Sequence, residues 1–119
     1  MANVDLIPTY PGVTGDMVAG SAGAISTITY TAIADRKHVI GAVYWSYDAA
    51  PTGGAISIED VSGTTVWGPF AITAAGPGSL PIYPAIVGQA VNTAMLVKLA
   101  APGGSVQGRV GARHWTVGG

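Results

Sequence analysis

Apolar and polar residues alternate along several short segments of the chain, which is the pattern of β-strands with one buried face. Residues 25–33 show it clearly, because Ile28 and Tyr30 fall on one face and the threonines at 27, 29 and 31 fall on the other. Residues 55–60 alternate in the same way. We therefore predict a half-buried strand in each segment.

Residues 39–47 differ because both parities are apolar. This pattern is typical of a central strand that is covered on both faces. Residues 65–72 follow residues 55–60 after a short Ser-Gly-Thr turn, so the two segments are predicted to form a hairpin. Residues 95–99 are predicted to be another strand.

Two further segments have marked positional preferences. Residues 105–117 form the last predicted strand, with one face toward the core and one toward solvent. The core-facing residues are Val106, Val110, Ala112 and His114, and the solvent-facing residues are Gln107, Arg109 and Arg113. Residues 80–86 are extended, but Pro81 and Pro84 restrict them to an edge or a crossover. Residues 74–79 are predicted to be a loop too rich in glycine and proline to pair.

The whole pattern predicts an all-β fold. Helical periodicity is almost absent, and 18 glycines and 8 prolines interrupt the chain into seven or eight short strands. We predict one β-sandwich or jelly-roll domain over residues 25–119. Residues 1–24 lack a period and are predicted to be an extended arm, either a loose terminus or a segment that orders on a neighbouring subunit.

Charge is scarce in this chain. Charged residues make up 9% of the sequence, against about 25% in ordinary globular proteins, and none occurs between Val61 and Val97. Such a chain either covers its surface with Ser, Thr and Gly or buries much of it against other chains. We favour an oligomer or lattice over a neutral monomer.

The sequence argues against two classes of partner, membranes and nucleic acids. The uncharged stretch is interrupted by prolines and glycines that would break a membrane-spanning helix, so no membrane partner is expected. The five basic residues form no run and the net charge is −1, so no nucleic-acid partner is expected.

Catalytic and metal-binding patterns are weak. The chain has no cysteine, and its two histidines, His38 and His114, have no known ligand spacing with Asp48 or Asp60. The sequence has no Gly-x-Ser-x-Gly motif, and the adjacent carboxylates Glu59 and Asp60 would point to opposite faces of a strand. We expect no enzyme activity, no cofactor and no metal, with both histidines in structural roles.

The aromatic residues allow a second interpretation. A sugar-stacking platform could form from Trp45, Tyr47, Trp67, Tyr83 and Trp115, with Asp48, Gln89 and Asn92 as polar neighbours. Core packing is favoured for Trp45 and Tyr47, which share one face of the predicted central strand. The Arg36-Lys37 doublet is expected in a solvated turn, or in an ion pair with a neighbouring subunit.

The order of turns and strands also resembles a known family. The stretches HVIGAVYWSY, SIEDVSGTTVWGPFAI, AAGPGSLPIYPA and GQAVNTAMLVKLAAPGGSVQGRVGARHW are similar to small tailed-phage virion proteins of the capsid decoration, or cement, type. The resemblance covers Lys37 to Trp115. It implies a homotrimeric β-sandwich without enzymatic chemistry, made in the host cytoplasm and bound to the major capsid protein on the outer capsid surface, where it stabilises capsomer contacts. The alternative is a fibre- or tail-associated domain that binds a receptor or carbohydrate.

These considerations predict where subunits or capsid would be contacted. We place Tyr83 at the centre of the contact, within the uncharged, proline-stiffened edge. The full set of predicted contact residues is Tyr10, Met17, Arg36, Lys37, Trp67, Leu80 and Tyr83.

Overall fold

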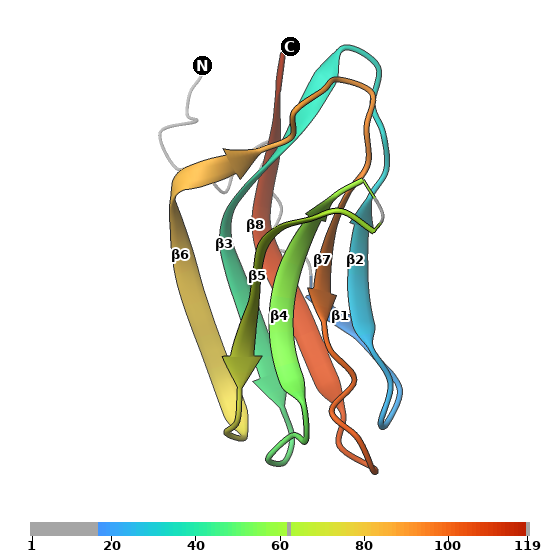
Figure 1. Ribbon diagram of the computed structural model, residues 1–119, viewed down its shortest axis with the longest axis vertical. Helices are drawn as coiled ribbons and strands as arrows, with labels where there is room; N and C mark the ends of the chain where they lie inside the picture. Colours follow the sequence, from blue (N-terminus) through green and yellow to red (C-terminus); the bar gives the residue numbers. More distant parts are fainter. Residues whose placement is uncertain (1–16, 62, 119) are drawn as a thin grey trace, which may run out of the picture.

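The protein is a β-sandwich of two four-stranded antiparallel sheets, which confirms the predicted all-β fold (Figure 1). The structure, a computed structural model, describes residues 17–61 and 63–118. The strands are β1 (Met17–Ala19), β2 (Ser26–Tyr30), β3 (Arg36–Tyr47), β4 (Gly54–Asp60), β5 (Thr65–Ile72), β6 (Gly76–Val87), β7 (Met95–Leu99) and β8 (Gly108–Gly118). Within these described ranges, no helix has the length and apolar character to cross a membrane.

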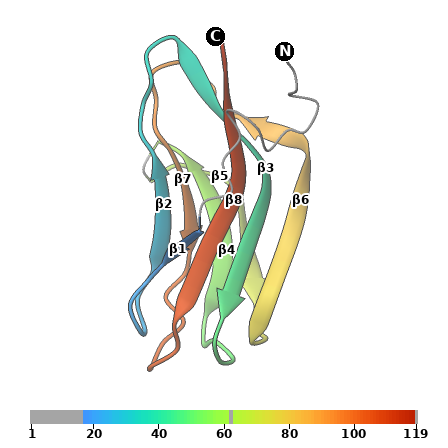
Figure 2. The ribbon, with the colours of Figure 1, turned by 180° about the vertical axis from the view of Figure 1, so that it is seen from behind.

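The strand orders are β1-β8-β3-β6 in one sheet and β2-β7-β4-β5 in the other. Across the core, β1 contacts β2 and β8 contacts β7, so the two strand orders run in the same direction from one side of the sandwich to the other. The last strands of the two orders, β6 and β5, therefore end the sandwich on the same side. Figure 2, seen from behind, shows β8, β3 and β6 side by side across the outer face of the first sheet.

Most predicted strands are confirmed. Residues 65–72 and 95–99 are strands with the predicted bounds, and the segment from residue 39 to residue 47 lies in β3, between β8 and β6. The predicted hairpin is the antiparallel pair of β4 and β5. The proline-containing segment after residue 80 lies in an edge strand, as predicted.

The prediction of a loop over residues 74–79 is wrong for its last four residues. Residues 76–79 begin β6 and pair with residues 44–47 of β3. Two features permit this pairing. As an edge strand, β6 tolerates prolines. Gly78 lies opposite Trp45, and its missing side chain leaves room for the indole ring.

The predicted arm divides into two parts. Residues 17–19 form β1 and pair with β8, where Met17 lies opposite Gly111 and Ala19 opposite Arg109. Residues 1–16, which include the predicted contact residue Tyr10, lie outside the described residues. The second sheet begins at Ser26, next to the predicted domain boundary.

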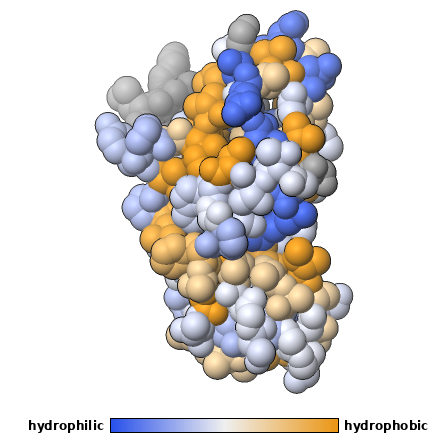
Figure 3. Space-filling view, in the orientation of Figure 1, coloured by the Kyte–Doolittle hydropathy of each residue, from blue (hydrophilic) through white to orange (hydrophobic). Residues whose placement is uncertain are grey.

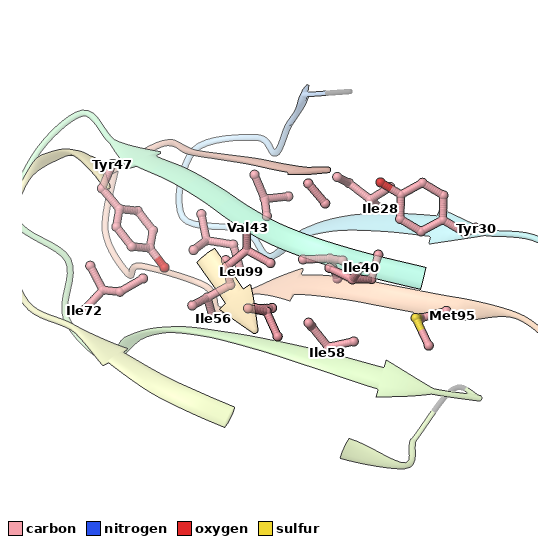
Figure 4. Packing of buried hydrophobic residues seen from close by; sticks show 14 residues of the cluster. Ile28, Tyr30, Ile40, Val43, Tyr47, Ile56, Ile58, Ile72, Met95 and Leu99 are labelled. Atoms are coloured by element: carbon pink, nitrogen blue, oxygen red, sulfur yellow. The ribbon is translucent and has the colours of Figure 1, made fainter. Parts of the chain in front are cut away.

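The core lies between the sheets and is almost entirely aliphatic (Figure 4). Its fully buried members come from both sheets and include Ile40, Val43, Val110, Ile56, Ile58 and Val97. Tyr47 brings a polar group into this core, and its hydroxyl donates a hydrogen bond of 2.8 Å to the carbonyl oxygen of Ala100. Desolvation by burial raises the pKa of this hydroxyl, so Tyr47 is a neutral donor.

One ion pair stabilises the outer face of the second sheet. Glu59 Oε2 lies 3.0 Å from Lys98 Nζ, and Glu59 Oε1 accepts a 2.7 Å hydrogen bond from the backbone N–H of Gly63. The Gly63 bond first, and then Lys98, hold the pKa of the Glu59 carboxyl below its usual range. The unfolded chain therefore binds this proton more readily than the folded chain.

We expect Glu59→Gln to lower the free energy of unfolding by about 1 kcal/mol near neutral pH. Because the folded pKa is lowered, the charged form contributes stability above the unfolded pKa of about 4.3, and this contribution is lost as the pH falls through the folded pKa. Urea unfolding near pH 7 and near pH 2 should show the gap between wild type and variant closing in acid. Asp35→Asn, in the exposed turn before β3, is the matched control, and a gap that persists in acid would contradict the assignment.

Candidate functional site

Two histidines from neighbouring strands meet inside the sandwich. Nδ1 of His38, on β3, lies 2.8 Å from Nε2 of His114, on β8, and Nε2 of His38 lies 2.7 Å from the carbonyl oxygen of Thr31. The ring of Tyr30, at the end of β2, stacks on His114 with 3.7 Å between centroids. The predicted inward position of His114 is confirmed, because the residue is buried.

The hydrogen bonds define the tautomers of the neutral pair. A carbonyl oxygen only accepts, so His38 donates from Nε2 to Thr31 and its Nδ1 is an acceptor. His114 must then donate from Nε2 to His38. Residues 17–61 and 63–118 contain no group of three His, Cys, Asp or Glu residues placed to hold a metal ion. The geometry of the pair is that of a structural link between β2, β3 and β8.

A groove lies on the outer face of the first sheet, where β6 departs from regular pairing. Gly41 of β3 faces residues 82–85 of β6, because pairing stops at Pro81 and resumes at Ile86. The unpaired residues form a bulge, a feature common beside functional sites. The hollow has a volume of about 660 Å³, and we call it the Trp115 groove; its main lining residues are Gly41, Pro81, Tyr83, Pro84, Arg113 and Trp115.

The floor of the groove depends on a glycine. A Cβ atom on Gly41 would lie 2.7 Å from Cζ3 of Trp115, so the indole ring rests against the bare backbone of β3. The guanidinium carbon of Arg113 lies 5.5 Å from the centroid of the same ring, which is a cation–π distance. Tyr83 stands on the bulge with 97% of its surface exposed. The groove thus offers aromatic and proline surface with one positive charge.

The structure separates the five aromatic residues of the predicted sugar platform. Tyr47 is fully buried and Trp45 packs against the core, which confirms the core prediction for these two residues. Trp67 also packs against the core. Tyr83 and Trp115 meet in the groove. The predicted polar neighbours do not line it. Gln89 instead lines a separate hollow of about 270 Å³ beside Asp60.

The second candidate surface is the side of the sandwich where β5 and β6 end the two sheets. We call it the β5–β6 edge, and its exposed apolar residues include Val66, Pro69, Phe70, Pro81, Tyr83 and Val87. All of them belong to the uncharged stretch from Val61 to Val97. In Figure 3 apolar residues gather at the upper left, near the end of β6, and the lower third of the view lacks the strongest hydrophilic colours.

The predicted contact residues occupy different environments. Tyr83 is exposed, whereas Trp67 and Leu80 are half-buried and pack against the core. Arg36 lies at the start of β3 and donates to the hydroxyl and carbonyl oxygens of Thr116 at 2.9–3.1 Å. Lys37, next to it, is half-buried. The structure therefore brings none of Arg36, Trp67 and Leu80 into the groove with Tyr83.

Sequence reasoning missed the roles of Gly41 and Arg113. The sequence pattern places Arg113 only on the solvent-facing side of the last strand, and it places Gly41 only within a central strand. A glycine within an otherwise apolar strand is the one available signal, because it often marks a close approach of another group. The partner of that approach lies on a strand distant in sequence, so the glycine alone does not identify Trp115.

Comparisons with known proteins give distant similarities. No protein-family model and no curated protein matches the chain. Among solved structures, it is similar to a virus-like particle of the extra small virus of the prawn Macrobrachium rosenbergii, at 13% identity and a TM-score of 0.32 over 87% of this chain and 77% of that chain. It is also similar to a carbohydrate-binding module CBM36 in complex with calcium and xylotriose, at 17% identity and a TM-score of 0.38 over 83% of this chain and 76% of that chain. The CBM36-1 domain of a multidomain xylanase from the hindgut metagenome of Trinervitermes trinervoides is similar at 13% identity and a TM-score of 0.40, over 87% of this chain and 76% of that chain. At these values the similarities carry no argument for function.

Proposed function

We propose that the protein is a virion structural protein of the capsid decoration type, which forms homotrimers and binds the major capsid protein on the capsid surface. The observation that carries the proposal is the β5–β6 edge. There a stretch of 37 residues without a charged side chain ends both sheets and exposes Val66, Phe70 and Tyr83. The sequence resemblance to tailed-phage decoration proteins adds the location and the trimeric state.

The edge is suited to contact through side chains rather than through added strands. Prolines at 69, 77, 81 and 84 lie on its two strands and remove backbone donors. A stable interface covers about 800 Å² per partner, roughly an eighth of the 6090 Å² surface of this domain. Apolar residues without charge favour burial of this size, because no ion has to be desolvated.

We expect light scattering at micromolar concentration to give about three times the chain mass, and Phe70→Lys to shift it toward the monomer. Phe70 is 47% exposed on β5. Replacing an interface phenylalanine removes about 1.5–3 kcal/mol of burial, which weakens each contact by roughly 10- to 100-fold.

Ile33→Lys is the matched control. Ile33 is 45% exposed but lies in the connection between β2 and β3, away from the edge, so this variant should remain trimeric. Circular dichroism should show strand content unchanged in both variants. A monomeric wild-type chain, or equal dissociation of the two variants, would refute assembly through this edge.

Decoration itself is tested with capsids. Shells assembled from the major capsid protein of the same genome should carry the chain through sedimentation, and Phe70→Lys should reduce the amount carried. Trimers that fail to sediment with any such shell would separate self-assembly from capsid binding and overturn the decoration role.

A receptor- or carbohydrate-binding role is the second candidate, and it is favoured by the exposed Tyr83 beside Trp115. A sugar site usually adds carboxylate or amide side chains around its aromatic ring, and the side chains that line the groove supply no such group, only the Arg113 guanidinium, the Tyr83 hydroxyl and the Trp115 indole N–H. A strong hit on a glycan array that Tyr83→Ala abolishes would favour this candidate over decoration.

A further inference from the structure

The Trp115 groove shares Pro81 and Tyr83 with the β5–β6 edge, but its floor, formed by Gly41 and Trp115, lies on the outer face of the first sheet. We propose that it is the docking site for the N-terminal segment of the same chain, with residues 8–11 seated as a polyproline II turn. This inference is independent of the proposed function, since it concerns the fold of one chain.

The first argument is the chemistry of the groove. Its walls are the bulge with Tyr83 and Pro84 on one side and the Trp115 ring on the other, over the bare backbone of Gly41. Aromatic-lined grooves of this kind recognise proline-rich segments in the polyproline II conformation, which need few backbone hydrogen bonds. A volume of about 660 Å³ lies within the range of about 300–1,000 Å³ typical of ligand sites.

The second argument is the sequence of the segment. Residues 8–11 read Pro-Thr-Tyr-Pro, so two prolines are three positions apart. A polyproline II helix has three residues per turn, which places Pro8 and Pro11 on one edge, with Asp5 on the same edge about 9 Å further along. Prolines on the aromatic rings would therefore leave the Asp5 carboxylate directed along the groove.

Charge is complementary between the two parts. The first sixteen residues contain two aspartates, Asp5 and Asp16, and no Lys or Arg. The groove contains one charged side chain, Arg113, which is held over the Trp115 ring. A carboxylate near this guanidinium gains a charge-assisted contact at a partly desolvated site.

The third argument is the place where the segment joins the sheet. Met17 lies opposite Gly111 of β8, so the segment joins the sheet two residues from Arg113 and four residues from Trp115 along β8. Five residues lie between Pro11 and Met17, and the six steps from one to the other can span about 20 Å when extended. The path from β1 across β8 to β3 is two strand spacings, about 10 Å. The segment is thus long enough, and its attachment keeps it at high effective concentration near the groove.

Paramagnetic labelling of the full chain tests this docking. The protein has no cysteine, so Thr9→Cys gives a single site for a nitroxide. In a ¹⁵N-labelled sample, we expect the nitroxide to remove most of the peak height of the Trp115 indole N–H and of the Gly41 and Ala85 amides. Reduction of the nitroxide should restore these signals.

Two controls decide between the outcomes. Pro8→Ala with Pro11→Ala, carrying the same label, should recover at least half of the lost peak height without moving the core signals. A mixture of isotope-labelled chain without nitroxide and unlabelled chain with nitroxide should show undiminished groove signals. Unchanged peaks in the first sample would overturn docking, and peak loss in the mixture would assign the groove to the arm of another copy instead. Neither result depends on the Phe70→Lys assembly test.

Discussion

Replacing His114 with alanine is expected to lower the free energy of unfolding by about 3 kcal/mol. The side chain is buried, stacks on Tyr30 and donates to Nδ1 of His38 across 2.8 Å. Truncation leaves a cavity where the ring was, and it deprives a buried acceptor of its donor. Each change has a cost, since cavities in a packed core destabilise and an unsatisfied buried polar atom costs about 1–3 kcal/mol.

A second substitution separates the two contributions. His114→Phe keeps a flat ring against Tyr30 and fills most of the volume, but it offers His38 no N–H donor. We expect it to lose about 1–2 kcal/mol, clearly less than alanine. Urea unfolding of the three proteins at one pH measures both differences. Equal losses in the two variants would mean that the hydrogen bond carries the whole effect and that ring packing contributes nothing.

The strand pattern could be predicted from the sequence because burial imposes a period of two on it. Residues 65–72 and 95–99 alternate or run apolar between turn residues, and the structure gives them the predicted bounds. The central position of β3 followed from apolar residues on both parities. Such signals are local, so they require no knowledge of which strands become neighbours.

The Trp115 groove could not be predicted in this way. It requires a bulge at residues 82–85, a glycine in β3 opposite it, and an indole from β8, three strands that pairing alone brings together. Tyr83 and Trp115 belong to the sugar-binding platform predicted from the sequence. That prediction also includes Trp45, Tyr47 and Trp67, which lie in the core or against it. Exposure of an aromatic side chain depends on the neighbouring strand, which local periodicity does not specify.

The domain has three special features, and two of them share residues, because Pro81 and Tyr83 belong both to the Trp115 groove and to the β5–β6 edge. The histidine pair links β3 and β8 and reaches the end of β2, the Trp115 groove lies on the outer face of the first sheet, and the β5–β6 edge ends both sheets. The substitutions at His114 and Phe70 leave the groove lining intact, because neither residue lines the groove. Folding, arm docking and assembly can therefore be tested one at a time, with energies that should add for sites that share no contacts.

Gly78→Ala is expected to lower the free energy of unfolding by about 2–3 kcal/mol, although it adds one methyl group to an edge strand. The new Cβ would meet Cε2 and Cζ2 of the Trp45 ring and would lie 2.7 Å from its Nε1. The indole ring is rigid and packs against the core, so the clash is relieved only if the whole ring moves. Displacement of the whole ring should also change tryptophan fluorescence in the folded state.

Gly88→Ala is the matched control for this substitution. It lies just beyond β6, where the nearest side-chain atom to a new Cβ is Asp60 Oδ1 at 3.5 Å, an ordinary contact distance. We expect its stability to remain within about 0.5 kcal/mol of wild type. A neutral Gly78→Ala would mean that Trp45 has space to move, and the pairing of residues 76–79 with β3 would then need another cause than the fit of the indole against a glycine.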